Sequence, residues 1–313
     1  MLSEKTVFIL GAGASRPYEY PTGFELREEI CRDFLNDWVH YYRNKSMRDD
    51  EGKTQKLINK FVNAFSNSLN KSIDLFLTRN KEFEDVGKFA IVHFLLKAEN
   101  KSYNPSDYFD KQDWISYFYD KLTNEFKDDQ YYKISNNNIT IITFNYDRLL
   151  ENSLFLALDN SFTSANHYKV IEEIMKLNIF HVYGRIAKLD WEDEINGLAY
   201  KSRMENVFPP KYTENIRVLY DQRNIPNLLE IEFSLKEAER IFFLGFGFAE
   251  ENLEVLNLIN NINTNQKIYG TAKGLTKNEI SKIKSYFSKT HKFNNPDLII
   301  EDCDSLTLLR NYL

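Results

Sequence analysis

Hydrophobic and polar residues follow two different patterns along this chain. Short runs of β-branched and apolar residues, such as "TVFIL" at 6–10 and "ITIITF" at 139–144, are bounded by glycine or polar residues. Between these two runs the apolar positions recur at i+4 steps, as Leu26, Ile30 and Phe34 do. Continuous apolar runs are typical of buried strands, and the second spacing is typical of amphipathic helices. The pattern therefore predicts two buried strands separated by a long helical segment.

Strand signals return in the second half of the chain. Apolar runs that predict strands stand at 178–184, 239–248, 266–271 and 297–302. Helical patterns stand between the later strands, at 226–238, 250–262 and 276–289. Strands that alternate with helices favour a parallel sheet covered on both faces. We expect one α/β domain over 1–313, with a Rossmann-like, mostly parallel sheet flanked by helices. A large helical insertion over 27–135 follows the first strand.

The composition narrows the class of protein. Hydrophobic residues are 42% and aromatic residues 15% of the chain, which is enough to bury a large core. A net charge of -6, with acids and bases interspersed, argues against direct binding of duplex nucleic acid. Cys31 and Cys303 stand far apart and cannot form a four-thiolate zinc site. No apolar run reaches the roughly 20 residues of a membrane span, and signal-peptide features are missing, so we expect a cytoplasmic protein.

Glycine residues follow the first strand in "GAGAS". Gly11 can adopt a positive φ, and Gly13 allows a backbone N–H to approach a phosphate closely. Arg16 stands where a GxGxxG dinucleotide fingerprint has its third glycine, and no acidic ribose ligand follows on a nearby strand. This segment is either a nucleotide-binding loop or only a tight turn from strand to helix.

Polar and glycine residues also follow two later strands. In "TFNYD", Asn145 and Asp147 occupy alternate positions, where an amide can orient a water or ribose hydroxyl and a carboxylate can accept from a carboxamide. The alternative for this pair is an Asx turn that leads into a helix. In "FFLGFGFAEEN", Gly245 and Gly247 leave the strand, and Asn252 stands near a helix start. Ligands bind at the carboxyl ends of parallel strands, so these segments are candidate site loops.

The order of these motifs resembles the sirtuin-like (SIR2-like) family of NAD-consuming proteins. "GAGAS" with "YPTG" at 20–23 resembles the family's first NAD loop, and "TFNYD" resembles its Thr-Gln-Asn-Ile-Asp motif. "LGFGF" resembles the late glycine-containing ribose loop, and the ordered motifs extend over essentially the whole chain. "SIDLFL" and "IYGTAKGLT" also resemble segments of bacterial SIR2-like proteins of antiphage defence.

The resemblance implies a role for individual residues. Asn145 would hold the nicotinamide ribose and the attacking water, and Asp147 would bind the carboxamide. The loop after the first strand would hold the phosphates. The NAD-binding residues implied besides Asp147 are Gly11, Ala12, Gly13, Ser15, Thr22, Gly184, Gly245, Phe246, Gly247 and Asn252.

The segment "FHVYGRI" departs from the family pattern. The family's catalytic histidine stands immediately before the glycine, and that position is Tyr183 here. Residues two apart on a strand share a face, so His181 would lie beside Tyr183. His181 is a candidate general base, because imidazole titrates near neutrality, or else a core histidine. Tyr183 could instead orient ribose or water, and Arg185 could pair with a phosphate or face solvent.

The resemblance and the cysteine count together favour one activity. Deacetylase sirtuins carry a four-cysteine zinc ribbon that this chain cannot build, so protein deacylation is disfavoured. We expect an NAD glycohydrolase that cleaves NAD to nicotinamide and ADP-ribose and needs no metal. The resemblance implies antiphage defence by NAD depletion, homo-oligomers, and a separate partner such as an ATPase or a nucleic-acid sensor. Two alternatives are a non-catalytic module of the same fold that binds NAD or ADP-ribose, and an ADP-ribosyl transferase.

Overall fold

The fold is built on a parallel sheet. The computed structural model describes residues 1–42, 51–102, 113–207, 209–218, 225–291 and 297–313. Its sheet has six strands in the order β3-β2-β1-β4-β5-β6, all paired in parallel. The strands are β1 (Thr6–Leu10), β2 (Ile139–Thr143), β3 (Asn178–His181), β4 (Arg240–Leu244), β5 (Lys267–Thr271) and β6 (Leu298–Glu301). Each lies within a segment predicted as a strand, and the order is that of a Rossmann-like fold.

The central strands end together at one edge of the sheet. Leu10 pairs with Thr143 of β2 and with Leu244 of β4, so three strands finish at the same level. All five residues of β1 are buried, because helices cover both faces of the sheet. The chain leaves β1 toward one side of the sheet and β4 toward the other, so a crevice is expected where these two strands end.

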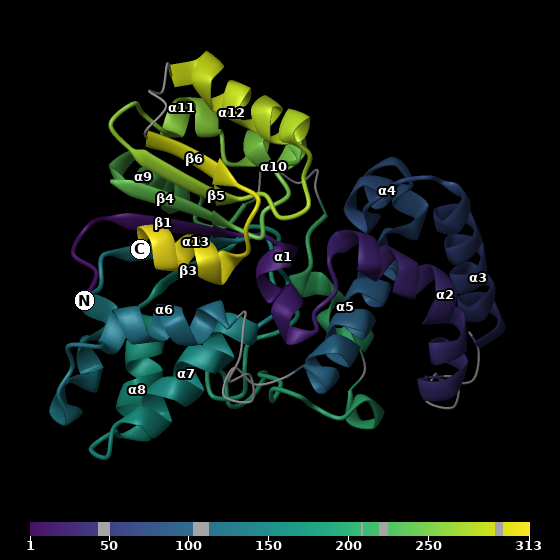
Figure 1. Ribbon diagram of the computed structural model, residues 1–313. Coiled ribbons are helices and arrows are strands. Elements are labelled where there is room, and N and C mark those ends of the chain that lie inside the picture. The colour runs from purple at the N-terminus through teal and green to yellow at the C-terminus, as the bar shows by residue number, and fades with distance from the viewer. Residues whose placement is uncertain (43–50, 103–112, 208, 219–224, 292–296) are drawn as a thin grey trace.

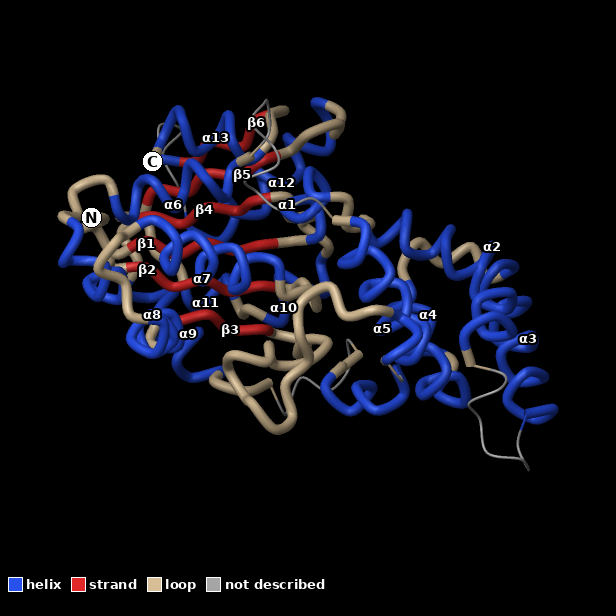
Figure 2. The backbone as a smooth tube through the Cα atoms, turned by 90° about the horizontal axis from the view of Figure 1, so that it is seen from below, coloured by secondary structure: helices blue, strands red, loops and turns tan. Residues whose placement is uncertain are grey.

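Helices divide between the two faces of the sheet (Figures 1 and 2). One face carries α6 (Trp114–Thr123), α7 (Leu149–Ser161), α8 (His167–Met175) and α13 (Ser305–Tyr312). The other carries α9 (Leu228–Glu237), α10 (Glu250–Val255), α11 (Leu258–Asn261) and α12 (Lys277–His291). The single helix expected over 250–262 is broken into α10 and α11, because Asn257 takes a left-handed conformation with φ 45°. Helices α8 and α13 are short and were not predicted.

Four helices lie beside the sheet as a separate layer, which we call the helical lobe (Figure 1). They are α2 (Gly23–Tyr41), α3 (Glu51–Asn67), α4 (Ile73–Arg79) and α5 (Glu84–Lys101). Phe34 of α2 packs edge-on against Phe61 of α3 and Phe89 of α5. The lobe agrees with the helical pattern between the first two strands. The boundaries 27–135 of a subdomain remain a prediction, because α6 packs against α7 and α13 on the sheet.

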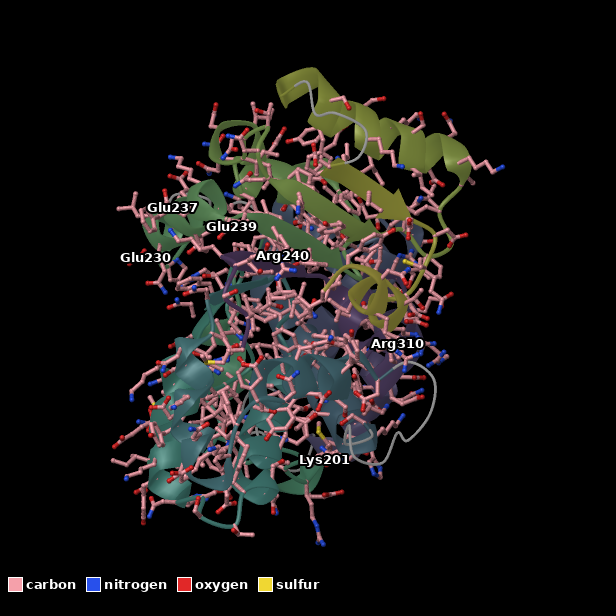
Figure 3. The ribbon with its side chains drawn as sticks, turned by 60° about the vertical axis from the view of Figure 1, so that its left-hand side comes forward. Lys201, Glu230, Glu237, Glu239, Arg240 and Arg310 are labelled. Atoms are coloured by element: carbon pink, nitrogen blue, oxygen red, sulfur yellow. The ribbon has the colours of Figure 1, made fainter. Side chains whose placement is uncertain are left out.

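The amino edge of the sheet carries charged residues in pairs. Arg240 at the start of β4 lies 2.8 Å from Glu4, and Lys5 lies 2.8 Å from Glu237 of α9. Figure 3 shows Arg240 with Glu237 and Glu239 near this edge. These charges tie the first residues of the chain to α9 and β4. None of the helices in the described part of the chain is both long and apolar enough to cross a bilayer.

Candidate active site

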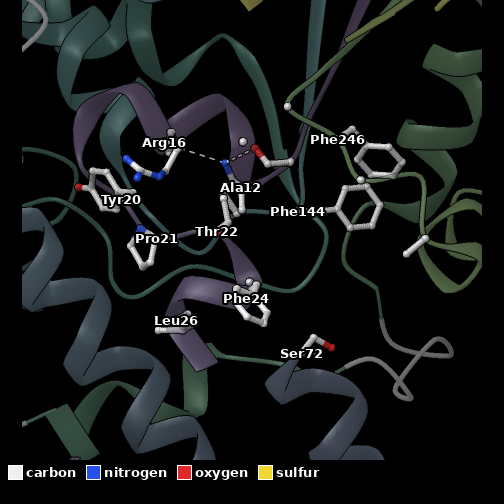
Figure 4. Close-up of a pocket in the computed structure, with 18 of the residues that line it drawn as sticks. Ala12, Arg16, Tyr20, Pro21, Thr22, Phe24, Leu26, Ser72, Phe144 and Phe246 are labelled. Atoms are coloured by element: carbon white, nitrogen blue, oxygen red, sulfur yellow. Dashed lines mark hydrogen bonds between the residues drawn. The ribbon is translucent and has the colours of Figure 1, made fainter. Parts of the chain in front are cut away.

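A cavity of about 1030 Å³ opens at the carboxyl edge of the sheet, where β1 and β4 end. Its walls come from the loops after β1, β2, β3 and β4, from the start of α2 and from α4 (Figure 4). Ligands of open parallel sheets bind at this reversal of strand order. The structure gathers most of the sequence-predicted residues in the cavity wall, namely Gly11, Ala12, Gly13, Ser15, Thr22, Asn145, Asp147, Tyr183, Gly245, Phe246, Gly247 and Asn252.

The two glycine loops pack backbone against backbone. The N–H of Gly13 donates to the carbonyl of Gly245 at 3.0 Å, and the N–H of Gly11 donates to that of Leu244 at 3.0 Å. Gly245 has φ 57°, and a Cβ there would collide with the backbone nitrogen of Ala14. These glycines are therefore required for the contact between the exits of β1 and β4, whether or not a phosphate lies against them.

The amide of Asn145 is held in one orientation. Its Nδ2 donates to the carbonyl of Gly11 and to Oγ of Ser15, both at 3.1 Å. The residue is only 9% exposed, and no group among the described residues donates to its Oδ1. Because both hydrogens of the amide are occupied, Oδ1 is the atom that remains to accept from a water or a ribose hydroxyl.

Asp147 has a structural role as well as a place in the cavity wall. Its Oδ1 accepts from the N–H of Leu149 at 3.1 Å, which is the Asx turn considered above, and its Oδ2 accepts from Ser15 at 2.8 Å. Burial raises the pKa of Asp147 to about 6, although these two hydrogen bonds oppose the rise. An ionised carboxylate has further lone pairs, so it can also accept from a carboxamide.

An aromatic wall stands beside Asn145. The ring of Phe144 lies 5.4 Å from that of Tyr183 and 5.2 Å from that of Phe246, both at steep angles. The hydroxyl of Tyr183 donates to Oδ1 of Asn252 at 3.0 Å. Burial raises the pKa of Tyr183 far above its ordinary value, so the phenol stays neutral. Tyr183 is thus a hydrogen-bond donor of the wall and a poor base.

His181 makes its contacts outside the lining of the large cavity. Its Nδ1 is 2.9 Å from the backbone oxygen of Asn145, and its Nε2 is 2.6 Å from Oε1 of Glu151. The prediction that His181 and Tyr183 share a strand face is wrong, because β3 ends at His181 and the chain turns before Tyr183. His181 is also not among the residues that line the large cavity.

The partners of His181 occupy both of its ring nitrogens. Burial alone would raise the pKa of Glu151, but the charges of His181 and Arg185 and the hydrogen bond from His181 lower it to about 2. One ring nitrogen of His181 is thus engaged by a backbone carbonyl and the other by a carboxylate, so neither is free to contact a water. This geometry supports a positioning role for His181 toward the loop that carries Asn145.

Gly184 and Arg185, which follow Tyr183 in the chain, also make internal contacts. Gly184 has φ 79°, and a Cβ there would collide with the carbonyl oxygen of Asn215, next to the bridge that Gly184 forms with Ile216. Gly184 is not part of the cavity lining, and its role toward a ligand stays a prediction. Arg185 pairs with Glu151 at 3.3 Å and with Glu192 at 2.8 Å and is not part of the cavity lining.

Thr22 lines the cavity at the start of α2 but also caps that helix. Its Oγ1 accepts from the N–H of Glu25, and its own N–H and hydroxyl donate to the Glu25 carboxylate at 2.8 and 2.9 Å. The same carboxylate accepts from Arg16 at 2.8 Å, which places the guanidinium beside the "GAGAS" loop. The pair Arg16 and Glu25 is partly exposed, and Arg16 lines the cavity.

Some residues of the cavity wall were not predicted from the sequence. They include the cations Arg16, Lys71 and Lys273 and the carboxylate Asp74. Single charged residues on loops and at helix ends usually face solvent, so their positions in the sequence do not indicate a site. The fold brings these four residues to one cavity. The one available signal was "SIDLFL", the motif that contains Asp74. Across the described residues, no group of three or more His, Cys, Asp or Glu side chains is placed to hold a metal ion.

Comparison with known proteins gives one family match. The sequence model described as the SIR2-like domain matches residues 139–284, which include "TFNYD", "FHVYGRI" and "LGFGF". No curated protein matches the chain. One similar solved structure is a crystal structure of Sir2 with the inhibitor EX-527, 2'-O-acetyl-ADP-ribose and a deacetylated p53 peptide. It is 13% identical, with 98% of this chain and 91% of that chain covered and a TM-score of 0.35, too low to support a comparison of sites.

The family match and the fold agree. The matched segment begins at β2 and reaches into α12, so it contains the loops after β2, β3 and β4 that form much of the cavity wall. Residues 139–284, slightly under half of the chain, are therefore similar to the SIR2-like domain.

Proposed function

We propose that this protein hydrolyses the N-glycosidic bond of NAD and releases nicotinamide and ADP-ribose. The observation that carries the proposal is Asn145, whose amide is locked by Gly11 and Ser15 with Oδ1 left to accept in the cavity. A locked acceptor at this position orients a water or a ribose hydroxyl without a cost of ordering during the reaction.

The residues around Asn145 suit the parts of NAD. Asp147 offers an acceptor for the carboxamide NH₂ of nicotinamide, and the aromatic wall of Phe144 and Phe246 offers a surface for its ring. The glycine loop and the Arg16 guanidinium suit the diphosphate, because backbone N–H groups and cations bind phosphate oxygens. The nicotinamide ring leaves as a neutral molecule when the bond electrons return to its cationic nitrogen.

The Asn145→Ala variant tests this proposal. We expect it to lose NAD cleavage by at least about 100-fold, as removal of one oriented polar group in an active site does. The measurement is nicotinamide release by purified protein, alone and with the products of neighbouring genes. Asn160→Ala, at an exposed position of α7, is the matched control and should retain full activity. Equal cleavage by the wild type and Asn145→Ala would refute the proposal.

A second candidate is a module of the same fold that binds NAD or ADP-ribose without cleaving it. Tyr183, which stands at the position of the family's histidine and is fixed to Asn252, favours this reading. Calorimetric binding of NAD by the wild type, with no nicotinamide release under any condition, would support it. Radiolabel from NAD that becomes attached to a protein would instead indicate ADP-ribosyl transfer.

The biological setting is a further part of the proposal. NAD depletion during phage infection, homo-oligomers and a separate partner such as an ATPase or nucleic-acid sensor rest on the family resemblance alone. NAD content of infected cells with the wild type or Asn145→Ala is the measurement that checks the defence role. An unchanged NAD content in infected wild-type cells would contradict it.

A further inference from the structure

The hydrolysis proposed above requires a group that takes a proton from the attacking water. Both ring nitrogens of His181 are already engaged, by the Asn145 carbonyl and by Glu151, and Tyr183 is a neutral phenol that donates to Asn252. Both oxygens of Asp147 accept internal hydrogen bonds from Ser15 and the start of α7. None of these three groups is therefore well placed to act as the general base, although each lies near Asn145.

Asp74 has the properties that these three groups lack. It is the second residue of α4, and its half-buried side chain lines the cavity. Oδ1 of Asp74 accepts from the hydroxyl of Tyr146 at 2.8 Å, and Tyr146 directly follows Asn145 in the chain. Tyr146 is the side chain that donates to this carboxylate, and the donation goes to Oδ1. The helical lobe thus adds a carboxylate to the site, attached to the loop that carries Asn145.

The contact between Asp74 and Tyr146 suits a carboxylate that changes its protonation state. The Tyr146 hydroxyl also lies 2.9 Å from the backbone oxygen of Arg217, but it has one hydrogen for two acceptors. When Asp74 is ionised, Tyr146 donates to it. When Asp74 is protonated, it can donate to the Tyr146 oxygen while the phenol hydrogen turns to the Arg217 carbonyl. A hydrogen bond joins the two residues in both states.

The surroundings of Asp74 raise the pKa of its carboxyl group, which makes its carboxylate a better base. Burial raises the pKa of Asp74, and the hydrogen bond from Tyr146 opposes that rise. The titratable and charged groups that line the same cavity include Tyr146, Tyr183, Lys71 and Glu251. The charge of Asp74 adds to burial in raising the pKa of Tyr183. A carboxylate with a raised pKa is a stronger base than one at the surface.

We propose that Asp74 of the helical lobe is the general base of NAD hydrolysis, in place of the histidine that this chain lacks before Gly184. This inference rests on the proposed function. In the step, the water oxygen forms a bond to the anomeric carbon of the ribose, and the water proton passes to Asp74. The bond from that carbon to nicotinamide breaks, and its electrons stay on the ring nitrogen, which becomes neutral. Solvent then removes the proton from Asp74.

Asp74→Asn is the first test, because asparagine keeps the shape and still accepts from Tyr146. We expect kcat to fall about 100-fold or more, with NAD affinity retained. The rate of the wild type should rise with pH as Asp74 loses its proton, and this rising limb should disappear in Asp74→Asn. Asp85→Asn, at an exposed position at the start of α5, is the matched control and should behave as wild type.

Azide provides a second test, because an anionic nucleophile needs no base. NAD consumption by Asp74→Ala should be restored by azide, with an ADP-ribosyl azide as the product, whereas Asn145→Ala should not respond. An Asp74→Ala variant that stays inactive with azide has a structural defect and overturns the assignment. Wild-type kinetics in Asp74→Asn, with Asn145→Ala inactive, overturn this proposal alone. An inactive wild type overturns both this proposal and the proposed function.

Discussion

At the scale of single residues, the partners of a side chain decide what it can do. Asn145 and His181 belong to one connected group, since the ring of His181 contacts the backbone oxygen of Asn145. Asn145 turns its amide hydrogens inward and keeps an acceptor for a ligand. His181 has its two nitrogens occupied by Asn145 and Glu151. Asn145 therefore presents an acceptor to the cavity, whereas His181 holds the loop that carries Asn145.

The pH dependence of stability reports on the His181 and Glu151 pair. The pKa of Glu151 falls from 4.5 to about 2 on folding, so the pair stabilises the folded state fully above pH 4.5. That contribution should be lost progressively as the pH falls from 4.5 toward 2. Unfolding free energies of the wild type and Glu151→Gln, measured by denaturant titration across this range, check the prediction. The slope of the unfolding free energy against pH should be smaller in Glu151→Gln than in the wild type. Identical slopes in the two proteins would contradict the assignment.

At the scale of elements, the site depends on how closely two strand exits approach each other. The loops after β1 and β4 touch through Gly11, Gly13 and Gly245 with no side chain between them. Short parallel strands that are buried on both faces hold this contact in register. The glycines of "GAGAS" and "LGFGF" are thus explained by packing, and their approach to a phosphate is an additional proposed use.

Gly245→Ala should disrupt this contact. The new Cβ would meet the backbone of Gly13 and Ala14, and alanine would have to adopt φ 57°. We expect a loss of about 1–3 kcal/mol in the free energy of unfolding, the usual cost of such strain. Gly247→Ala is the control, because no atom lies within 4 Å of a Cβ at that position. Equal stability of the two variants in thermal unfolding would argue against the packing explanation.

At the scale of the whole molecule, a buried ion pair connects the helical lobe to the sheet. Glu99 of α5 lies 2.6 Å from Arg148 at the start of α7, and neither side chain is exposed. Glu99 also accepts from the N–H of Lys201, and Arg148 donates to the carbonyl of Lys188. Because the lobe supplies Asp74 to the cavity, this pair links the position of the lobe to the completeness of the site.

Removal of Glu99 should therefore affect both stability and the site. Glu99→Ala leaves the Arg148 charge buried without its partner, which costs about 3–5 kcal/mol in typical cases. Chemical denaturation should show this loss, and NAD binding should weaken as α4 moves. Glu237→Gln removes the partner of exposed Lys5 and should leave stability essentially unchanged. A Glu99→Ala protein as stable as Glu237→Gln would show that the pair does not hold the lobe.

The sequence by itself determined the six strands and the loops that follow them, because hydrophobic period and turn residues are local properties. It also placed Asn145 and Asp147 at a strand end, where parallel strands bind ligands. It could not show that β3 stops at His181, that Asn257 breaks a helix, or that α8 and α13 form. These features depend on small differences in local backbone conformation, and tertiary packing decides between the alternatives.

Only the tertiary structure decided which polar groups share the cavity. Asp74 is separated from Tyr146 in sequence by α5, α6 and β2, yet their side chains meet at 2.8 Å. The orientation of the Asn145 amide depends on Gly11 and Ser15, and the direction of His181 depends on Glu151. Hydrogen bonds act over a few ångströms in space, with no regard to chain separation. For this reason the motifs locate the site, while the folded arrangement determines the task of each side chain.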